Sequence, residues 1–220
     1  MDNIINMLPE IVKSIQQTIM MVVISITAAV VFGGPLGIFL YLTSQNSLHQ
    51  SRWLNRTANY LVNLVRSFPF IILLLSLIPL TRLITGTTIG PVAASVSLSV
   101  AAIPFFGRLV EQSLREVPRG IIEAAVSTGA NTWFIIRRVL LSEARPSLMS
   151  GLTVTIVSFI SYSAMAGAVG GGGVGDLAIR YGYYRFQTDI MVTCIVILLF
   201  LVQLVQSVGT WAAGRLDKRK

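Results

Sequence analysis

The residues most able to make a specific contact lie in one polar stretch of this 220-residue chain, residues 108–145. Glu123 carries a carboxylate there, Ala124 and Ala125 follow it, and Gly129 comes four residues later. Helical spacing over residues 119–128 separates two faces. One face collects Ile121, Ile122, Ala125 and Thr128, and the other collects Arg119, Glu123 and Ser127. This spacing predicts a short two-faced helix, which from periodicity alone could simply cover one end of a helical bundle.

Both ends of this short helix can be predicted as well. Pro118 suits the first turn of a helix, because its missing N–H would be unpaired there in any case. Gly129 stands where helices commonly end in a left-handed residue, a conformation that glycine adopts without a side-chain penalty. Asn131 or Thr132 can then cap a second helix that begins at Trp133.

No group of residues has the spacing of a catalytic or metal site. The phosphate-binding pattern G-x-x-x-x-G-K-[ST] is absent, and no lysine follows a glycine. The single histidine, His49, has no cysteine or cluster of carboxylates near it, and no Ser-His-Asp arrangement is supported. Residues 170–175 match G-x-G-x-x-G, but they follow a long apolar run rather than a strand, so a dinucleotide site is rejected. We expect no catalysis, no metal and no cofactor in this chain.

The composition is that of an integral membrane protein. Hydrophobic residues make up 54% of the chain and charged residues 12%, whereas a soluble domain carries roughly 25% charge. A helix needs about 20 mainly apolar residues to cross the hydrocarbon core. Five segments qualify, at residues 18–42, 60–80, 91–110, 148–169 and 190–211. The sequence therefore predicts an all-α membrane protein with five spans in a single domain, residues 1–220. Cys194 lies inside the fifth span, so no disulfide within the chain is possible.

The positive charges predict how these spans are oriented. One side of the predicted membrane receives Arg52, Arg56, Arg108, Arg115, Arg119, Arg137, Arg138, Arg145, Arg215, Lys218, Arg219 and Lys220. The other side receives only Lys13, Arg82, Arg180 and Arg185. The positive-inside rule then places the C-terminus in the cytoplasm and the N-terminus outside. Since topology accounts for most of the net charge of +8, nucleic-acid binding is disfavoured.

Several features within or beside the spans have two possible structural interpretations each. Residues 1–17 show helical spacing of apolar residues, and they either lie on the outer membrane surface or extend the first span. Gly33, Gly34, Pro35 and Gly37 mark a kink or a packing point in that span. Arg66 either snorkels to the cytoplasmic interface or faces the interior and bonds to a neighbouring element.

Small residues dominate residues 161–175, where an unwound end of the fourth span is expected. Tyr162, Ser163 and Met165 in this stretch could line a pathway at a symmetric interface, although ordinary close packing of helices explains the neighbouring alanines and glycines equally well. Residues 176–185 are expected to form an external loop rich in aromatic and charged side chains. It suits either an interfacial belt or contact with a protein outside the membrane.

The polar stretch resembles the signature loop of ABC-importer permeases. That loop has Glu-Ala-Ala, three residues, Gly, nine residues, Ile, any residue, Leu and Pro, and here Val139 and Leu141 stand in the Ile and Leu positions while Ser142 replaces Pro. The resemblance implies a permease of the type I kind whose loop forms a coupling helix and docks on a cytoplasmic ATP-binding subunit. It implies that Glu123, Ala124, Ala125 and Gly129 are the docking residues, and that ATP hydrolysis belongs to the partner.

Three further strings are similar to the methionine-uptake permeases within that family: residues 66–74, 162–170 and 181–183. This resemblance implies a homodimer in a bacterial inner membrane, bound to two ATP-binding subunits and supplied by an extracytoplasmic methionine-binding lipoprotein. A permease for another amino acid or small solute remains an alternative. A membrane scaffold that recruits a cytoplasmic partner through the same loop remains a second one.

Overall fold

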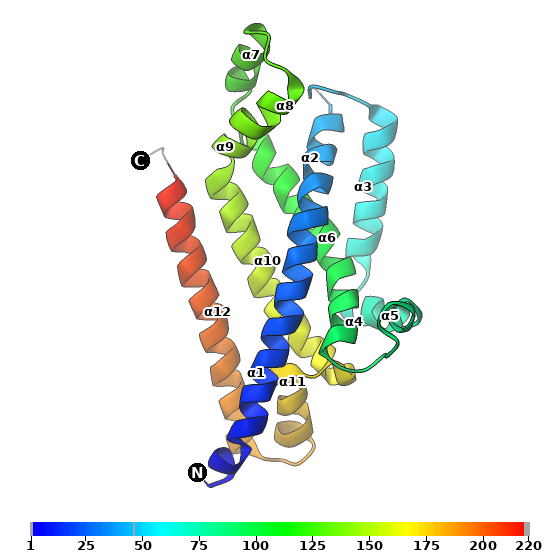
Figure 1. Cartoon of the computed structure of the whole chain (residues 1–220), viewed down its shortest axis with the longest axis vertical. Helices are drawn as coiled ribbons and strands as arrows, with labels where there is room; N and C mark the ends of the chain where they lie inside the picture. The colour runs from blue at the N-terminus through cyan, green and yellow to red at the C-terminus, as the bar shows by residue number, and fades with distance from the viewer. Residues whose placement is uncertain (1, 46, 218–220) are drawn as a thin grey trace.

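The computed structural model describes residues 2–45 and 47–217, so Met1 and three residues of the basic tail, Lys218, Arg219 and Lys220, lie outside it. The chain begins with one long helical rod. It comprises α1 (Asp2–Ala28), a π-helical turn (Ala29–Gly33) and α2 (Gly34–Thr43) (Figure 1). Of the two readings of the N-terminal segment, the structure supports the extension of the first span. The side chains of residues 2–6, including those of Ile4 and Ile5, are outside the description.

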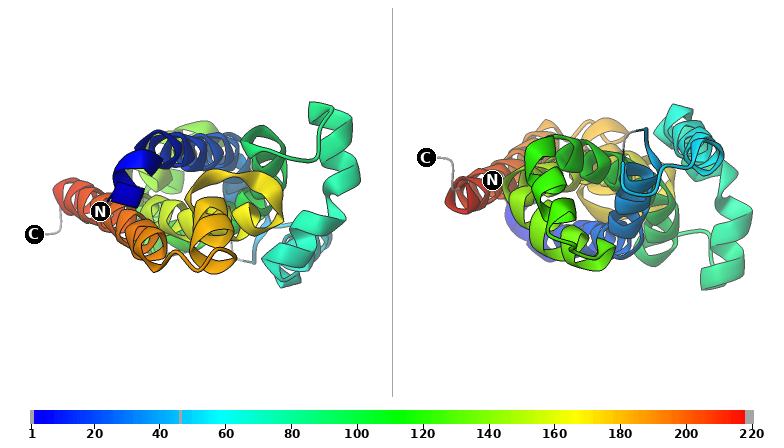
Figure 2. Two further views of the ribbon diagram at one scale, coloured as in Figure 1. Left: turned by 90° about the horizontal axis from the view of Figure 1, so that it is seen from below. Right: turned by 90° about the horizontal axis from the view of Figure 1, so that it is seen from above.

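The predicted second span, residues 60–80, is wrong as one continuous helix. α3 (Arg52–Ser67) ends before Pro69, and α4 (Phe70–Ser76) departs from it at 100°. Phe68 is extended, with φ −73° and ψ 132°, as expected for a residue that precedes proline. A second proline, Pro79, lies in the first turn of α5 (Ile78–Thr85). α4 and α5 therefore form a lateral arm beside the bundle (Figure 2).

The other predicted spans are long helices. They are α6 (Pro91–Arg115), α10 (Arg145–Ala166) and α12 (Thr188–Leu216), and α6 continues through Pro104 in its interior. Within residues 2–45 and 47–217, four helices are long and apolar enough to cross a membrane, and a fifth span exists if α3 and α4 count as one broken span. α1 begins at the end of the bundle opposite to the end where α12 finishes (Figure 1).

Glycines bring α2 against α6. A Cβ atom on Gly33 would lie 2.5 Å from the backbone oxygen of Ile103, and one on Gly37 would lie 2.6 Å from Cβ of Val110. Gly107 of α6 faces the same contact. The expected packing point in the first span is confirmed, because only hydrogen fits between the two backbones here.

The fourth span unwinds after Ala166, as expected. A distorted π-helical turn (Gly167–Gly171) leads into α11 (Gly173–Leu177), and Gly170, Gly172 and Gly173 all have positive φ. The side chain of Gln17 accepts a hydrogen bond from the N–H of Gly173 at 2.9 Å, and Thr18 accepts one from Val174 at 3.0 Å. The long first helix thus satisfies backbone groups that the unwinding leaves free.

The segment expected to be an external loop, residues 176–185, is largely helical. α11 continues into a π-helical turn (Ala178–Tyr183), and apolar side chains explain why. Val174 and Leu177 are fully buried in a cluster with Ile11, Ile190 and Cys194, which joins α1, α11 and α12. The main core lies nearer the centre of the bundle, where buried side chains of α6 pack against Met21 and Phe159.

Candidate docking helix and solute pathway

The predicted two-faced helix is present as α7 (Arg119–Ser127), which projects at one end of the bundle (Figure 1). Pro118 immediately precedes it rather than lying in its first turn. Gly129 has φ +77°, the left-handed conformation predicted from its position. Asn131 caps α8 (Thr132–Phe134) by accepting a hydrogen bond from the N–H of Phe134 at 2.8 Å.

The four candidate docking residues lie together on this projection. Glu123, Ala124 and Gly129 are exposed, and Ala125 is half-buried against the core. Ala125 also accepts a backbone hydrogen bond from Ala130 at 3.2 Å, which holds the turn after Gly129 against α7. One face of α7 therefore presents an exposed carboxylate and small side chains. The opposite face packs against the bundle through Ile122 and Ala125.

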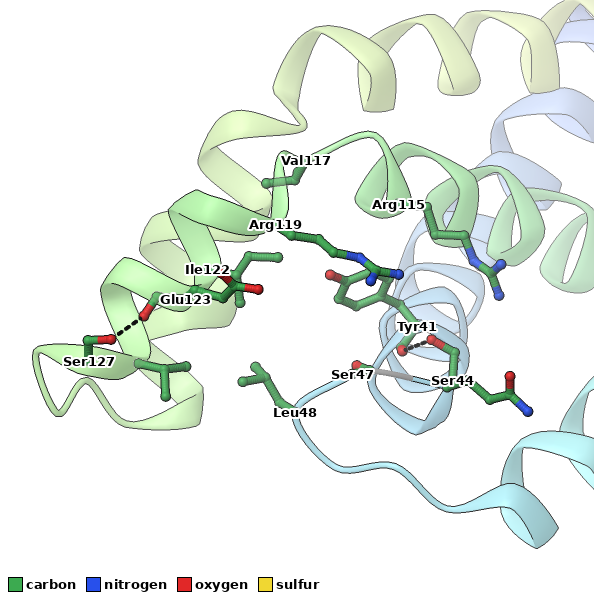
Figure 3. A pocket seen from close by; sticks show the side chains of 12 residues that line it. Tyr41, Ser44, Ser47, Leu48, Arg115, Val117, Arg119, Ile122, Glu123 and Ser127 are labelled. Atoms are coloured by element: carbon green, nitrogen blue, oxygen red, sulfur yellow. Dashed lines mark hydrogen bonds between the residues drawn. The ribbon is translucent and has the colours of Figure 1, made fainter.

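A pocket of about 530 Å³ lies between α7 and the segment that follows α2. Figure 3 shows the guanidinium of Arg119 beside the ring of Tyr41, with Arg115 near them and Glu123 on the neighbouring turn of α7. Leu48 lies across from Ile122 at the other side of the opening (Figure 3). The first turn of α7 thus carries a basic side chain, Arg119, and the acidic Glu123 follows one turn later.

A buried ion cluster supports the helix that leads into this projection. Glu111 of α6 is 1% exposed, and its two oxygens contact Arg108 and Arg115 at 2.6 Å each. Arg108 also donates a hydrogen bond to Asn63 of α3 at 2.8 Å. Sequence reasoning missed this cluster, although the spacing of Arg108, Glu111 and Arg115 at i, i+3 and i+7 is the signal that could have found it.

The three candidate pathway residues do not share one surface of α10. Tyr162 is half-buried and stacks on Phe70 of α4, with ring centroids 4.7 Å apart. Ser163 is 1% exposed, and its hydroxyl donates to the backbone oxygen of Ile160 at 2.7 Å. Met165 is 40% exposed. Tyr162 and Met165 are therefore accessible at the surface of this chain, whereas Ser163 points into its packing.

Arg66 lies at the last turn of α3, directly before the break. Its side chain is exposed, and neither a hydrogen bond nor an ion pair joins it to any residue that the structure describes. It lines a cavity of about 230 Å³ together with Phe70, Phe105 and Tyr162. The bond to a neighbouring element that one reading of the sequence offered is absent from the described part of the chain.

The opposite end of the bundle carries a second group of charges. Arg180 contacts Asp176 at 2.8 Å and Glu10 of α1 at 3.4 Å, and Tyr181 donates a hydrogen bond to Glu10 at 2.9 Å. Burial opposes the charge of Arg180, but the hydrogen bond to Asp176 and the two carboxylates outweigh it and raise the pKa of Arg180. Arg185 lies over the ring of Tyr181, 4.5 Å from its centroid. These contacts tie the long first helix to the segment after α11.

Metal ligands do not cluster anywhere in residues 2–45 and 47–217: the structure brings together no group of three or more His, Cys, Asp or Glu side chains that could hold an ion. His49 contacts Thr132 across the base of the projection, with 3.4 Å between Nε2 and Oγ1. This contact connects the segment after α2 to α8.

Known proteins resemble this chain over most of its length. A probable D-methionine transport system permease protein, MetI, of Vibrio cholerae is 48% identical over 203 residues, which cover 92% of this chain and 90% of that protein. The methionine import system permease protein MetP of Bacillus subtilis is 43% identical over 180 residues, which cover 82% of this chain and 81% of that one.

The fold agrees with these relatives. A solved structure of inward-facing conformations of the MetNI methionine ABC transporter contains a chain that is 41% identical and matches with a TM-score of 0.95, over 97% of this chain and 99% of that chain. Residues 33–220 match the family model of the inner membrane component of binding-protein-dependent transport systems. The chain belongs to this family of inner membrane transport components.

Proposed function

We propose that this chain is the permease subunit of a bacterial ATP-driven methionine importer. The observation that carries the proposal is the match of nearly the whole chain to a subunit of a methionine transporter, at 41% identity and a TM-score of 0.95. Relatives named for methionine transport in Vibrio cholerae and Bacillus subtilis support the same solute. Residues 1–220 would act as one permease domain, since one hydrophobic core joins α1, α6 and α10.

The permease would work by alternating access with partners. The transporter that it resembles is an ABC transporter, a class in which ATP drives transport, and the family is named for its dependence on a binding protein. The functional complex would contain a second copy of the chain, two cytoplasmic ATP-binding subunits and an extracytoplasmic solute-binding protein. The described residues contain four long helices, or five spans if α3 and α4 form one, and this number is small for enclosing a sealed route, which favours a pathway between two copies.

The docking surface would be the exposed side of α7. Glu123 and Ala124 would meet the ATP-binding subunit directly, Ala125 would hold the helix against the bundle, and Gly129 would set the turn that follows. The exposure of this surface, and the fixation of its other face to the core, support this role. Because α7 follows α6 through a short turn at Val117, a movement of the ATP-binding subunit would be passed to α6.

The pathway would run along the side of α10 that carries Tyr162 and Met165, with Ser163 packed behind it. The end of the bundle that carries α7 would face the cytoplasm, and the start of α1 would face outside. Arginine-rich elements at the α7 end, namely the start of α3, the end of α6 and the start of α10, support this orientation.

Reconstitution tests the function and its alternatives. The chain would be co-expressed with its ATP-binding subunit, purified, placed in liposomes and supplied with its binding protein, ATP and labelled methionine. We expect ATP-dependent uptake that unlabelled methionine competes away. Uptake competed only by another solute would support a different permease, and a stable complex without an ATP-binding subunit would support a scaffold.

A further inference from the structure

One face of α3 is polar along its whole length. Its members recur at intervals of three or four residues, which places them on one side of a helix. They are Arg52, Asn55, Arg56, Asn59, Asn63 and Arg66. Asn55 bonds to Thr43 at 3.0 Å and Asn63 accepts from Arg108 at 2.8 Å, so this polar face turns toward α2 and α6. Arg66 terminates the row without a partner among the described residues.

The position of Arg66 along α3 puts it inside the predicted second span. α3 starts at the end of the bundle that carries α7 (Figure 1), and Arg66 comes 14 residues after Arg52. At about 1.5 Å per residue, Arg66 lies about 21 Å from Arg52 along the helix, and about 9 Å beyond residue 60, where the predicted second span begins. A charge at this depth is stable only beside a water-filled space or an opposite charge.

The cavity beside Arg66 has an aromatic wall. Phe70 and Tyr162 are stacked, and Phe159 meets Tyr162 edge to face with centroids 5.1 Å apart. Phe105 of α6 lines the cavity too, and the rest of its lining is Val65, Phe68, Leu73 and Ala101. Thioether sulfur interacts favourably with aromatic rings. At about 230 Å³, the cavity lies below the range of about 300–1,000 Å³ typical of drug-sized ligands, as suits a smaller solute.

Among the residues whose side chains the structure describes, no carboxylate forms an ion pair with Arg66. Eight of its nine acidic residues lie toward the two ends of the bundle, at positions 2, 10, 116, 123, 143, 176, 189 and 217. The ninth, Glu111, already holds Arg108 and Arg115. A second copy of the chain would bring the same set, so it would add no free anion at this depth. An anion that enters the cavity beside Arg66 would therefore meet an unpaired guanidinium.

We propose that Arg66 binds the carboxylate of the transported amino acid, while the wall formed by Phe70, Phe105 and Tyr162 contacts its thioether side chain. This assignment rests on the proposed function, and it adds a transient solute site inside the membrane. The guanidinium is suited to the task because it binds a carboxylate through two parallel hydrogen bonds.

Protection of an introduced thiol tests the site without depending on transport. Ala101 lines the cavity, so Ala101→Cys would be introduced in a Cys194→Ala background and the complex with its ATP-binding subunit placed in nanodiscs. The rate of reaction with a methanethiosulfonate reagent would be measured with methionine and with methioninol. Methioninol keeps the amine and the thioether but has an uncharged hydroxymethyl group in place of the carboxylate.

We expect methionine, and not methioninol at equal concentration, to slow the reaction. Arg66→Gln should raise the methionine concentration needed for protection at least about tenfold, because a hydrogen bond to a charged group contributes about 1.5–3 kcal/mol. Arg56→Gln is the matched control, since it removes an exposed arginine from the same face of α3, about 15 Å nearer its start.

Equal protection by methionine and methioninol would overturn the assignment, as would full protection in Arg66→Gln. If Arg66→Gln fails to assemble, the comparison of the two compounds on the unsubstituted Arg66 protein still decides. Uptake assays distinguish failure of the carboxylate site at Arg66 from failure of the proposed methionine import. Protection by another amino acid but not its amino alcohol, without methionine uptake, would refute the methionine importer and retain the carboxylate site.

Discussion

Gly129 shows how one residue can be tested for its backbone conformation alone. Its φ is +77°, and a Cβ atom built on it would meet nothing within 4 Å. Gly129→Val should therefore cost about 1–2 kcal/mol in strain at the turn without any steric clash. We expect weaker stimulation of the ATP-binding subunit and slower uptake, with the spans still inserted. The assay is ATP hydrolysis and methionine uptake by the purified complex.

Gly86 provides the matched control for this change. It has φ +74°, also has open space around its Cβ position, and ends α5 on the lateral arm, away from α7. Gly86→Val should carry a similar strain and leave stimulation intact. Equal transport by Gly129→Val and the unsubstituted protein would argue against a docking role for this turn.

Glu111 offers a second test at the scale of a residue. Glu111→Gln leaves Arg108 and Arg115 facing a neutral amide, and the loss of a hydrogen bond to a charged group costs about 1.5–3 kcal/mol, less on the side of Arg115, whose side chain is 55% exposed to screening by solvent. We expect a clearly lower unfolding temperature of the detergent-solubilised complex. Glu143→Gln, an exposed acid at the same end of the bundle, should leave that temperature nearly unchanged. Similar melting of the two variants would contradict the supporting role of the cluster.

Residue-level features were predictable where their cause is local. The left-handed Gly129 and the cap by Asn131 follow from four or five neighbouring residues, and both are confirmed. The bond between Arg108 and Asn63 joins residues 45 positions apart, and nothing near either residue indicates the other. The unpaired state of Arg66 is likewise a property of the fold, because it depends on what surrounds the end of α3.

At the scale of elements, the contact between α2 and α6 depends on glycine at one side of a helix. Gly37→Val would push a side chain into Val110 and the backbone of Gly107, and overpacking typically costs about 1–3 kcal/mol. Gly34→Val is the control, because a Cβ atom on Gly34 has open space. We expect a lower melting temperature for the Gly37 variant than for the Gly34 variant. If the two variants have the same melting temperature, the change reflects helix propensity and not the contact between α2 and α6.

The exposed face of α10 leads to a prediction about the second copy. Met165 is a large flexible side chain, 40% exposed, beside alanine and glycine neighbours. If two copies meet there, a cysteine at position 165 in a background lacking Cys194 should cross-link between subunits, to an extent that changes with bound nucleotide. An intact dimer without any cross-link in any nucleotide state would place Met165 in lipid-facing packing.

Helix direction was less predictable than helix existence. Apolar content identified the segments that became α1 with α2, α6, α10 and α12, because burial in lipid depends on composition. The high apolar content of residues 60–80 likewise led to the prediction of one continuous span there. Hydropathy carries no information on direction, and the 100° turn comes from Pro69. The helical fold of residues 176–185 was missed because its stabilising partners, Glu10 and Ile11, lie in α1.

At the scale of the whole molecule, the asymmetry of basic residues gives a topology that can be measured. A small tag at Met1 should react with an impermeant reagent from outside, and a tag at Lys220 should react only after the cytoplasmic face is opened. The physical reason is the excess of arginine at the α7 end of the bundle. Labelling of both tags from the same side would refute an odd number of crossings.

The hydrogen bonds from Gly173 to Gln17 and from Val174 to Thr18 also bear on biogenesis. The bonded residues are 156 positions apart, so a ribosome that adds about 5–20 residues per second makes the acceptors about 8–30 s before the donors. During that interval the nascent first helix stays in the translocon or the bilayer, and the side chains of Gln17 and Thr18 can form hydrogen bonds only with water. These two hydrogen bonds can form only after α11 has been synthesised. We therefore expect chains truncated before Gly173 to be degraded faster in pulse-chase experiments than chains truncated after Leu177, and equal lifetimes would refute this order of assembly.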